Sequence, residues 1–122
     1  MKIYFDGGCR PNPGAMETAV VAQGCADVRQ NIGHGSSFDA EWLALIHAVE
    51  VAVAIGASNV VLLGDAATVV SQAIGRTKCR GVAIAHRARF MASIPAGLAV
   101  KVRQIKRTQN LAGIALSRLH DR

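Results

Sequence analysis

The fold class of this chain is decided by residues 37–65, SFDAEWLALIHAVEVAVAIGASNVVLLGD. The segment from Ser37 to about Ile55 is apolar on most faces, and Gly56 follows it. This pattern predicts a helix that is capped by Ser37, covered on more than one side and ended by the glycine. The short apolar run Asn59–Asp65 then predicts a central buried strand. A long helix that leads into a buried strand favours an α/β fold.

The other apolar runs predict the remaining elements around this pair. Three strands precede the long helix and would form an antiparallel meander, so the expected order is β-β-β-α-β-α-α-β-α in one mixed sheet. The expected bounds are Lys2–Cys9, Ala15–Gln23 and Ala26–Ile32 for the first three strands, Ala66–Ile74 and Gly81–Ser93 for the middle helices, Leu98–Ile105 for the fifth strand and Asn110–Leu119 for the last helix.

The composition suits one compact domain that spans residues 1–122. Apolar residues make up 51% of the chain and aromatic residues only 4%, so Val, Ile, Leu and Ala must fill the core. The three cysteines are far apart and lack a Cys-x-x-Cys pair, which favours a reducing cytoplasmic location. No signal-peptide pattern is present, and polar residues interrupt the stretch Trp42–Leu63, so we expect no membrane segment.

Charge is distributed unevenly between the two parts of the chain. Residues 1–75 carry three Lys or Arg against seven Asp or Glu, a net charge of −4, whereas residues 76–122 carry eleven against one, a net charge of +10. Such a basic half indicates a polyanion partner, with nucleic acid the first candidate. A solvated surface that keeps an apolar protein in solution explains the same asymmetry, so composition alone leaves both interpretations open.

Three acids lie where the predicted elements begin or end. Asp6 sits in the first strand, Glu41 in the first turn of the long helix, and Asp65 at the end of the central strand. Each also has a structural explanation: a turn residue, a partner of the helix dipole, and a helix cap, respectively. Sites of α/β folds gather outside the carboxyl ends of strands, and adjacent first and central strands would bring these carboxylates together. A divalent cation such as Mg²⁺ would relieve their repulsion.

The segment that follows Asp6 also fits a site for a phosphate-bearing ligand. Gly7 and Gly8 would let backbone approach a metal closely, and the proline-rich loop 10–14 would present Asn12 to a sugar-phosphate chain. Lys106 and Arg107 precede the last helix, where we expect a backbone phosphate contact.

Several motifs together resemble type 1 ribonuclease H of the bacterial and archaeal kind. YFDGGCRPNPG (residues 4–14) looks like the first motif of that family. AEWLALIHAVEVAVAIGASNVVLLGDAATVVSQAIG (40–75) is similar to its second and third motifs, and IKRTQNLAGIALSR (105–118) to its last helix. The resemblance implies a mixed five-stranded sheet, with three antiparallel strands followed by parallel strands and with helices on both faces.

The resemblance also implies an activity, namely endonucleolytic hydrolysis of the RNA strand of RNA–DNA hybrids by water that divalent metal activates. The cofactor would be Mg²⁺, with Mn²⁺ as substitute, and no small-molecule cofactor is expected. A monomer is the family expectation. By position, the catalytic and metal-binding residues would be Asp6, Glu41 and Asp65. The residues expected to bind nucleic acid are Gly7, Gly8, Arg10, Asn12, Ser37, Lys106, Arg107 and Asn110.

The chain departs from the family pattern at one metal-binding position. Where the family carries a fourth Asp, four residues after Asn110, this chain has Ile114, which cannot bind a metal. Asp121 lies about two helical turns further on and is a poor substitute, and His120 beside it is expected to fray. The alternative function is therefore a weakened or inactive domain that binds hybrid or duplex RNA. A related nuclease of the same fold, such as a junction resolvase, is a third interpretation.

Overall fold

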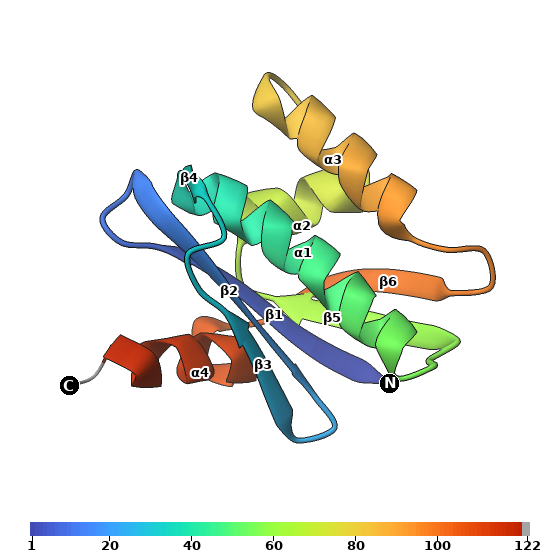
Figure 1. Ribbon diagram of the computed structural model, residues 1–122. Helices are drawn as coiled ribbons and strands as arrows, with labels where there is room; N and C mark the ends of the chain where they lie inside the picture. Colours follow the sequence, from blue (N-terminus) through green and yellow to red (C-terminus); the bar gives the residue numbers. More distant parts are fainter. Residues whose placement is uncertain (121–122) are drawn as a thin grey trace.

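The computed structural model describes residues 1–120 and shows one mixed sheet with helices on both faces (Figure 1). The strand order β3-β2-β1-β5-β6 combines antiparallel pairs β1–β2 and β2–β3 with parallel pairs β1–β5 and β5–β6, as predicted. The bounds are β1 Lys2–Cys9, β2 Gly14–Ala22, β3 Cys25–Arg29, β4 His34–Gly35, α1 Ser37–Ala54, β5 Asn59–Gly64, α2 Ala67–Ala73, α3 Val82–Ser93, β6 Ala99–Gln104, a 3₁₀ turn Arg107–Gln109 and α4 Leu111–His120.

The helices divide the apolar residues into two cores of unequal size. Helices α1, α2 and α3 cover one face of the sheet, and α4 covers the other (Figure 1). The larger core lies under the three helices and includes Phe5, Trp42 and Leu62, all fully buried. The smaller core consists of Ala19, Val21, Ala112 and Leu116, between the sheet and α4. The long helix α1 packs both on the sheet and against α3, as its apolar faces predict.

Three details differ from the expected bounds. The cap of α1 is Ser36 and not Ser37, because Ser36 Oγ accepts a hydrogen bond from Asp39 N at 3.1 Å, and Asp39 accepts in return from Ser36 N. Asp65 does not cap α2, whose first flanking residue is Ala66 with no side-chain bond. The third strand ends at Arg29, three residues early, and the short strand β4 pairs instead with the start of β2.

Gly7 is a point of close approach between α1 and β1. A Cβ atom on Gly7 would collide with the backbone carbonyl of Ala40, in the first turn of α1. Only glycine lets this turn lie on the strand, so Gly7 serves helix packing. The predicted approach of a metal at Gly7 stays a prediction. Gly64, at the end of β5, makes room for a side chain instead, because a Cβ there would enter the ring of Phe5 on β1.

The three cysteines, Cys9, Cys25 and Cys79, are free thiols. Within the part of the chain that the structure describes, no helix combines the length and the apolar character that a membrane crossing requires.

Substitution of the two adjacent glycines should separate their functions. Gly7→Ala forces backbone against backbone and should lower the free energy of unfolding by about 3 kcal/mol, at the upper end of overpacking costs. Gly8→Ala is the matched control, because its Cβ would meet side chains and no backbone: Glu17 at 3.3 Å and Leu116 at 3.7 Å. Urea titrations followed by circular dichroism measure both values, and equal losses would contradict the assignment.

His47 is a buried titratable group in α1, remote from the carboxylates. It is 2% exposed, and its Nδ1 lies 2.8 Å from Thr18 Oγ1 on β2. Burial lowers the pKa of His47 below the ordinary value of 6.5, and the positive charge of Arg29 adds to this effect. Asp27 lies 3.4 Å from Nε2 and Glu50 is on the same helix, and both oppose the shift. They oppose it weakly, because their side chains are 54% and 52% exposed and water screens them.

The depressed pKa makes stability depend on pH. Below about pH 6.5 the unfolded chain binds a proton at His47 that the folded chain resists, so the free energy of unfolding should fall as pH falls. His47→Asn keeps a polar atom for Thr18 and removes the titration. Denaturant titrations between pH 7.5 and about 5 should show a smaller loss of stability in the variant than in the wild type, and parallel curves would contradict this prediction.

Candidate active site

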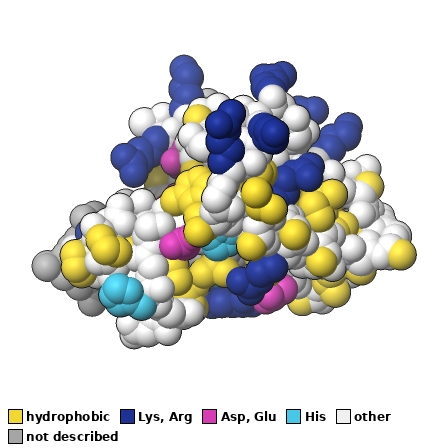
Figure 2. Space-filling model, turned by 90° about the horizontal axis from the view of Figure 1, so that it is seen from above, with side chains coloured by type: hydrophobic (Ala, Val, Ile, Leu, Met, Phe, Trp, Pro, Cys, Tyr) yellow, Lys and Arg dark blue, Asp and Glu magenta, His cyan; other side chains and the backbone are white. Residues whose placement is uncertain are grey.

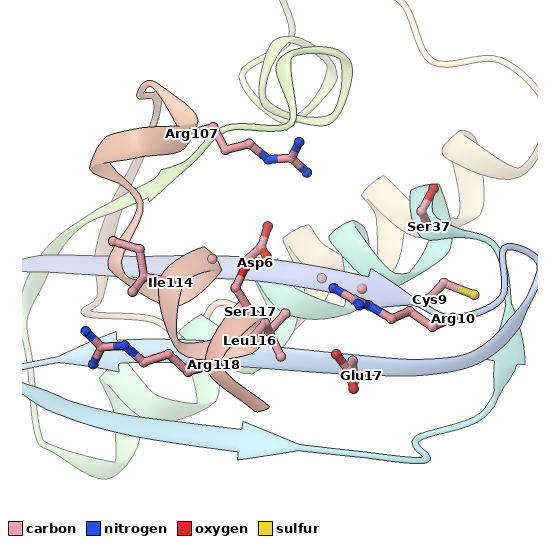
Figure 3. A pocket seen from close by; sticks show the side chains of 13 residues that line it. Asp6, Cys9, Arg10, Glu17, Ser37, Arg107, Ile114, Leu116, Ser117 and Arg118 are labelled. Carbon is pink, nitrogen blue, oxygen red and sulfur yellow. The ribbon is translucent and has the colours of Figure 1, made fainter. Parts of the chain in front are cut away.

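An open cleft runs across the carboxyl ends of β1 and β5. It consists of two adjoining cavities of about 470 and 380 Å³, which share Asp6, Gly7, Ser37 and Arg107. Glu41 and Asp65 line the smaller cavity together with the start of α2. Residues from β2 and α4 line the larger one, in which Asp6 lies centrally and Arg107 reaches over it (Figure 3).

The predicted acids converge on this cleft from three elements. The parallel register pairs Tyr4 with Leu63, so two residues further along, Asp6 lies beside Asp65. The close approach at Gly7 brings the first turn of α1 to the same point, and Gly7 N donates a 2.9 Å hydrogen bond to Glu41 Oε1. The sheet register and the glycine contact thus place Asp6, Glu41 and Asp65 together in the lining of the smaller cavity.

The crowding of these acids raises their pKa values. Burial, and then the negative charge of Asp6, raises the pKa of Glu41 to about 9. Burial is also the largest cause for Asp6, whose pKa rises to about 6 with a further contribution from the charge of Asp65. The Arg107 guanidinium opposes that rise at Asp6. Without a cation, the site therefore favours a protonated Glu41 at neutral pH.

The chemistry of this donor set fits a hard divalent cation. Glu41 Oε2 is buried and has no hydrogen-bond partner, although a carboxylate oxygen in such a place normally has one. Within residues 1–120, no group of three or more His, Cys, Asp or Glu side chains is placed so that it could hold a metal ion. Mg²⁺ does not require a complete set of protein ligands, because it keeps several waters and binds only a few carboxylates along with substrate phosphate.

Asn110 holds Asp65 in place from the start of α4. Its Nδ2 donates to Asp65 Oδ2 at 2.9 Å and to the carbonyl of Phe5 at 3.0 Å, and its Oδ1 accepts from Ala112 N. The side chain is fully buried. The structure therefore gives Asn110 a positioning role and not the predicted contact with nucleic acid.

The other residues predicted to bind nucleic acid lie at the rim of the cleft or support it. Asn12 and Ser37 bond to each other twice, at 2.9 and 3.0 Å, so Asn12 joins its loop to the start of α1 and its amide is not free. Arg10 and Arg107 are exposed and line the larger cavity. Lys106 is exposed next to Arg107 but lines neither cavity.

Two residues that sequence reasoning missed also belong to this region. Glu17 on β2 is 8% exposed and lines the larger cavity, and His120 Nε2 lies 2.7 Å from Glu17 Oε2. His120 was expected to fray, yet it is the last residue of α4 and holds this contact. One signal was available, namely a single acid in the stretch 15–22, which is apolar except for Glu17 and Thr18. Ile114 lines the same cavity, and Asp121 lies outside the described residues.

Basic side chains dominate a large part of the surface beyond the cleft. Figure 2 shows many more Lys and Arg than Asp and Glu side chains on the face seen from above. Six residues between the end of α2 and β6 contribute exposed positive charge: Arg76, Lys78, Arg80, Arg89, Lys101 and Arg103. The charge asymmetry of the sequence is therefore a real feature of the surface.

Comparisons with known proteins agree with this fold and site. The reverse transcriptase-like family model matches residues 5–120, and the chain belongs to this family of ribonuclease H-like domains. Comparison with curated protein sequences gives no significant match.

Several solved structures share the fold over nearly the whole chain. Ribonuclease H1 from the halophilic archaeon Halobacterium salinarum NRC-1 is 27% identical, with a TM-score of 0.84 over 99% of this chain and 98% of that chain. LC11-RNase H1 in complex with an RNA/DNA hybrid is 24% identical, with a TM-score of 0.77 over 94% and 91%. The N-terminal ribonuclease H domain of Rv2228c from Mycobacterium tuberculosis is 23% identical, with a TM-score of 0.73 over 98% and 96%. The fold is that of ribonuclease H1.

The role of Asn110 can be tested by its removal. Asn110→Ala leaves the Phe5 carbonyl and the Ala112 N–H buried without a partner, so it should cost about 1–3 kcal/mol of folding free energy. Thr108→Ala, at an exposed position two residues earlier, is the control and should be neutral. Chemical denaturation measures both, and a neutral Asn110→Ala would contradict the positioning role.

Proposed function

We propose that this protein is a Mg²⁺-dependent endoribonuclease that hydrolyses the RNA strand of RNA–DNA hybrids. The observation that carries the proposal is the convergence of Asp6, Glu41 and Asp65 on one open cleft, with a buried Glu41 oxygen left without a partner. Membership of a family of ribonuclease H-like domains supports a ribonuclease H function in general, without specifying the metal or the substrate. The neighbour LC11-RNase H1, solved with a hybrid, supports the choice of substrate.

The residues of the cleft would have separate roles in the proposed reaction. Asp6, Glu41 and Asp65 would hold the cation, whose positive charge would lower the cost of attack by water on the phosphodiester. Asn110 and the Gly7 N–H fix the directions of Asp65 and Glu41. Arg10 and Arg107, exposed at the rim, would contact backbone phosphates. Such contacts would recognise the shape of the hybrid and its 2′-hydroxyls, and not its sequence.

Cleavage of a labelled RNA–DNA hybrid with Mg²⁺, and then with Mn²⁺, tests the proposal. We expect cuts in the RNA strand only. Single-stranded RNA, duplex RNA, duplex DNA and a four-way junction are the control substrates, and preference for the junction would indicate a resolvase instead. Asp6→Asn should abolish cleavage without unfolding the protein, whereas Glu50→Gln, an exposed acid of α1 remote from the cleft, should retain it. Full activity of Asp6→Asn would refute the assignment.

A second candidate function follows from one position. Ile114 lines the cleft. The resemblance assigns an acid of the family to this position, so cation binding would be weaker here than in the family. The protein would then be a binding module that holds hybrid or duplex RNA without cleavage. Tight binding of the hybrid with no cut in either Mg²⁺ or Mn²⁺ would favour this function.

A further inference from the structure

A groove beside the edge strand β6 is a second hollow in the surface of the domain. It consists of two adjoining cavities of about 450 and 510 Å³, which share Ile74, Val102 and Arg103. Residues of α2, of the turn after it and of α3 form one wall, and the consecutive residues 100–104 of β6 form the other. The groove therefore follows the outer edge of the sheet, where β6 lies beyond β5 (Figure 1). Among residues 1–120, Ala67 alone lines both this groove and the cleft.

The backbone of β6 has unused hydrogen-bonding groups along this groove. The N–H groups of Ala99 and Ile105 donate hydrogen bonds on the side of β5. Because the bonding direction alternates along a strand, the N–H and C=O groups of Val100, Val102 and Gln104 point to the other side. No strand within residues 1–120 pairs with β6 on that side. Such an edge is a template on which a further strand can form.

Apolar side chains line the groove on the helix side of this edge. Val100 and Val102 pack, partly buried, against the larger core under the helices. Ile74, which follows α2, and Met91 of α3 are 47% and 48% exposed and face the same groove. An added strand would turn every second side chain toward these residues, and apolar side chains at those positions would remove them from water.

Basic side chains occupy the opposite face of the same edge. Lys101 and Arg103 alternate with the two valines, so their side chains point away from α2 and α3. Both are exposed, and neither forms an ion pair within residues 1–120. The remaining side chains of an added strand would lie opposite Lys101 and Arg103. Opposite charges across a strand pair stabilise it and like charges destabilise it, so acidic side chains suit these positions.

We propose that this groove binds an extended segment of a partner protein in which apolar and acidic side chains alternate, over about the six residues that β6 has. The segment would add to β6 as a further strand, with its apolar side chains against Ile74 and Met91 and its carboxylates beside Lys101 and Arg103. A second copy of β6 would bring the same two positive charges and be repelled. Nucleic acid would neutralise these charges, but it offers neither strand backbone for the edge nor aliphatic side chains for the apolar wall. The inference does not depend on nuclease activity.

Synthetic peptides test strand addition directly. The probe is a fluorescein-labelled peptide of about six residues in which valine and glutamate alternate, and fluorescence anisotropy measures its binding to the full chain. In two further peptides, the amides of either the valines or the glutamates are N-methylated. Only one of these two sets of amides faces β6 in an added strand, so we expect one methylated peptide to lose binding and the other to keep it. Equal affinities of the two methylated peptides, or no binding of the parent peptide, would overturn the proposal.

Two double variants separate the groove from the overall charge of the protein. Lys101→Glu combined with Arg103→Glu should weaken binding of the parent peptide at least about tenfold, because two favourable charge pairs become unfavourable. Lys78→Glu combined with Arg80→Glu changes the net charge by the same amount at exposed positions outside the groove, and should bind the peptide like the wild type. Equal losses in both double variants would indicate attraction by overall charge alone, and the proposal would be wrong.

The same variants show whether the groove binds nucleic acid instead. Each is titrated with a labelled RNA–DNA hybrid whose RNA strand is 2′-O-methylated, so that cleavage does not interfere. We expect the two double variants to bind this hybrid with similar affinities, because the groove is specific for the peptide. If Lys101→Glu with Arg103→Glu alone loses the hybrid while the wild type ignores the peptide, the groove is a nucleic-acid surface and the proposal is wrong.

Discussion

The contact between the first turn of α1 and strand β1 at Gly7 is the constraint on which the rest of the site depends. Helix backbone and strand backbone meet there without an intervening side chain, and a hydrogen bond from Gly7 to Glu41 is made at the same point. The contact sets the depth at which Glu41 is buried and thus the rise of its pKa to about 9. A looser contact would leave Glu41 in water, ionised and too remote to share a ligand with Asp6.

The cleft combines carboxylates that a cation would neutralise with arginines that phosphates would neutralise. Asp6 is common to both cavities, and Arg107 lies close enough to oppose the rise in the pKa of Asp6. A phosphodiester with a bound divalent cation carries both kinds of charge in one ligand, so such a ligand complements the whole cleft. Within residues 1–120, the carboxylates and the arginines that line the cleft form no ion pairs with one another, which leaves both kinds of charge available to such a ligand.

Periodicity and spacing predicted the fold because the apolar runs are long and uninterrupted. The strand order follows from the β-β-β-α-β pattern, and the parallel register then sets Asp6 beside Asp65 without further information. The features that were missed depend on contacts between residues far apart in the chain. His120 contacts Glu17, which lies 103 positions away in the sequence, and the buried amide of Asn110 donates to Phe5, 105 positions away. Ser36 was missed as the cap of α1 because Ser37 beside it is an equally good capping residue.

The two faces of the sheet are covered to very different extents, and this affects how the domain opens. Three helices and the large core protect one face, while the smaller core under α4 consists of four buried residues and three partly buried ones. Local unfolding separates elements that share few buried contacts, so we expect α4 to detach from its face without opening the larger core on the other face. Such a motion would change the α4 side of Asp6 and leave the position of Glu41, on the other face, unchanged.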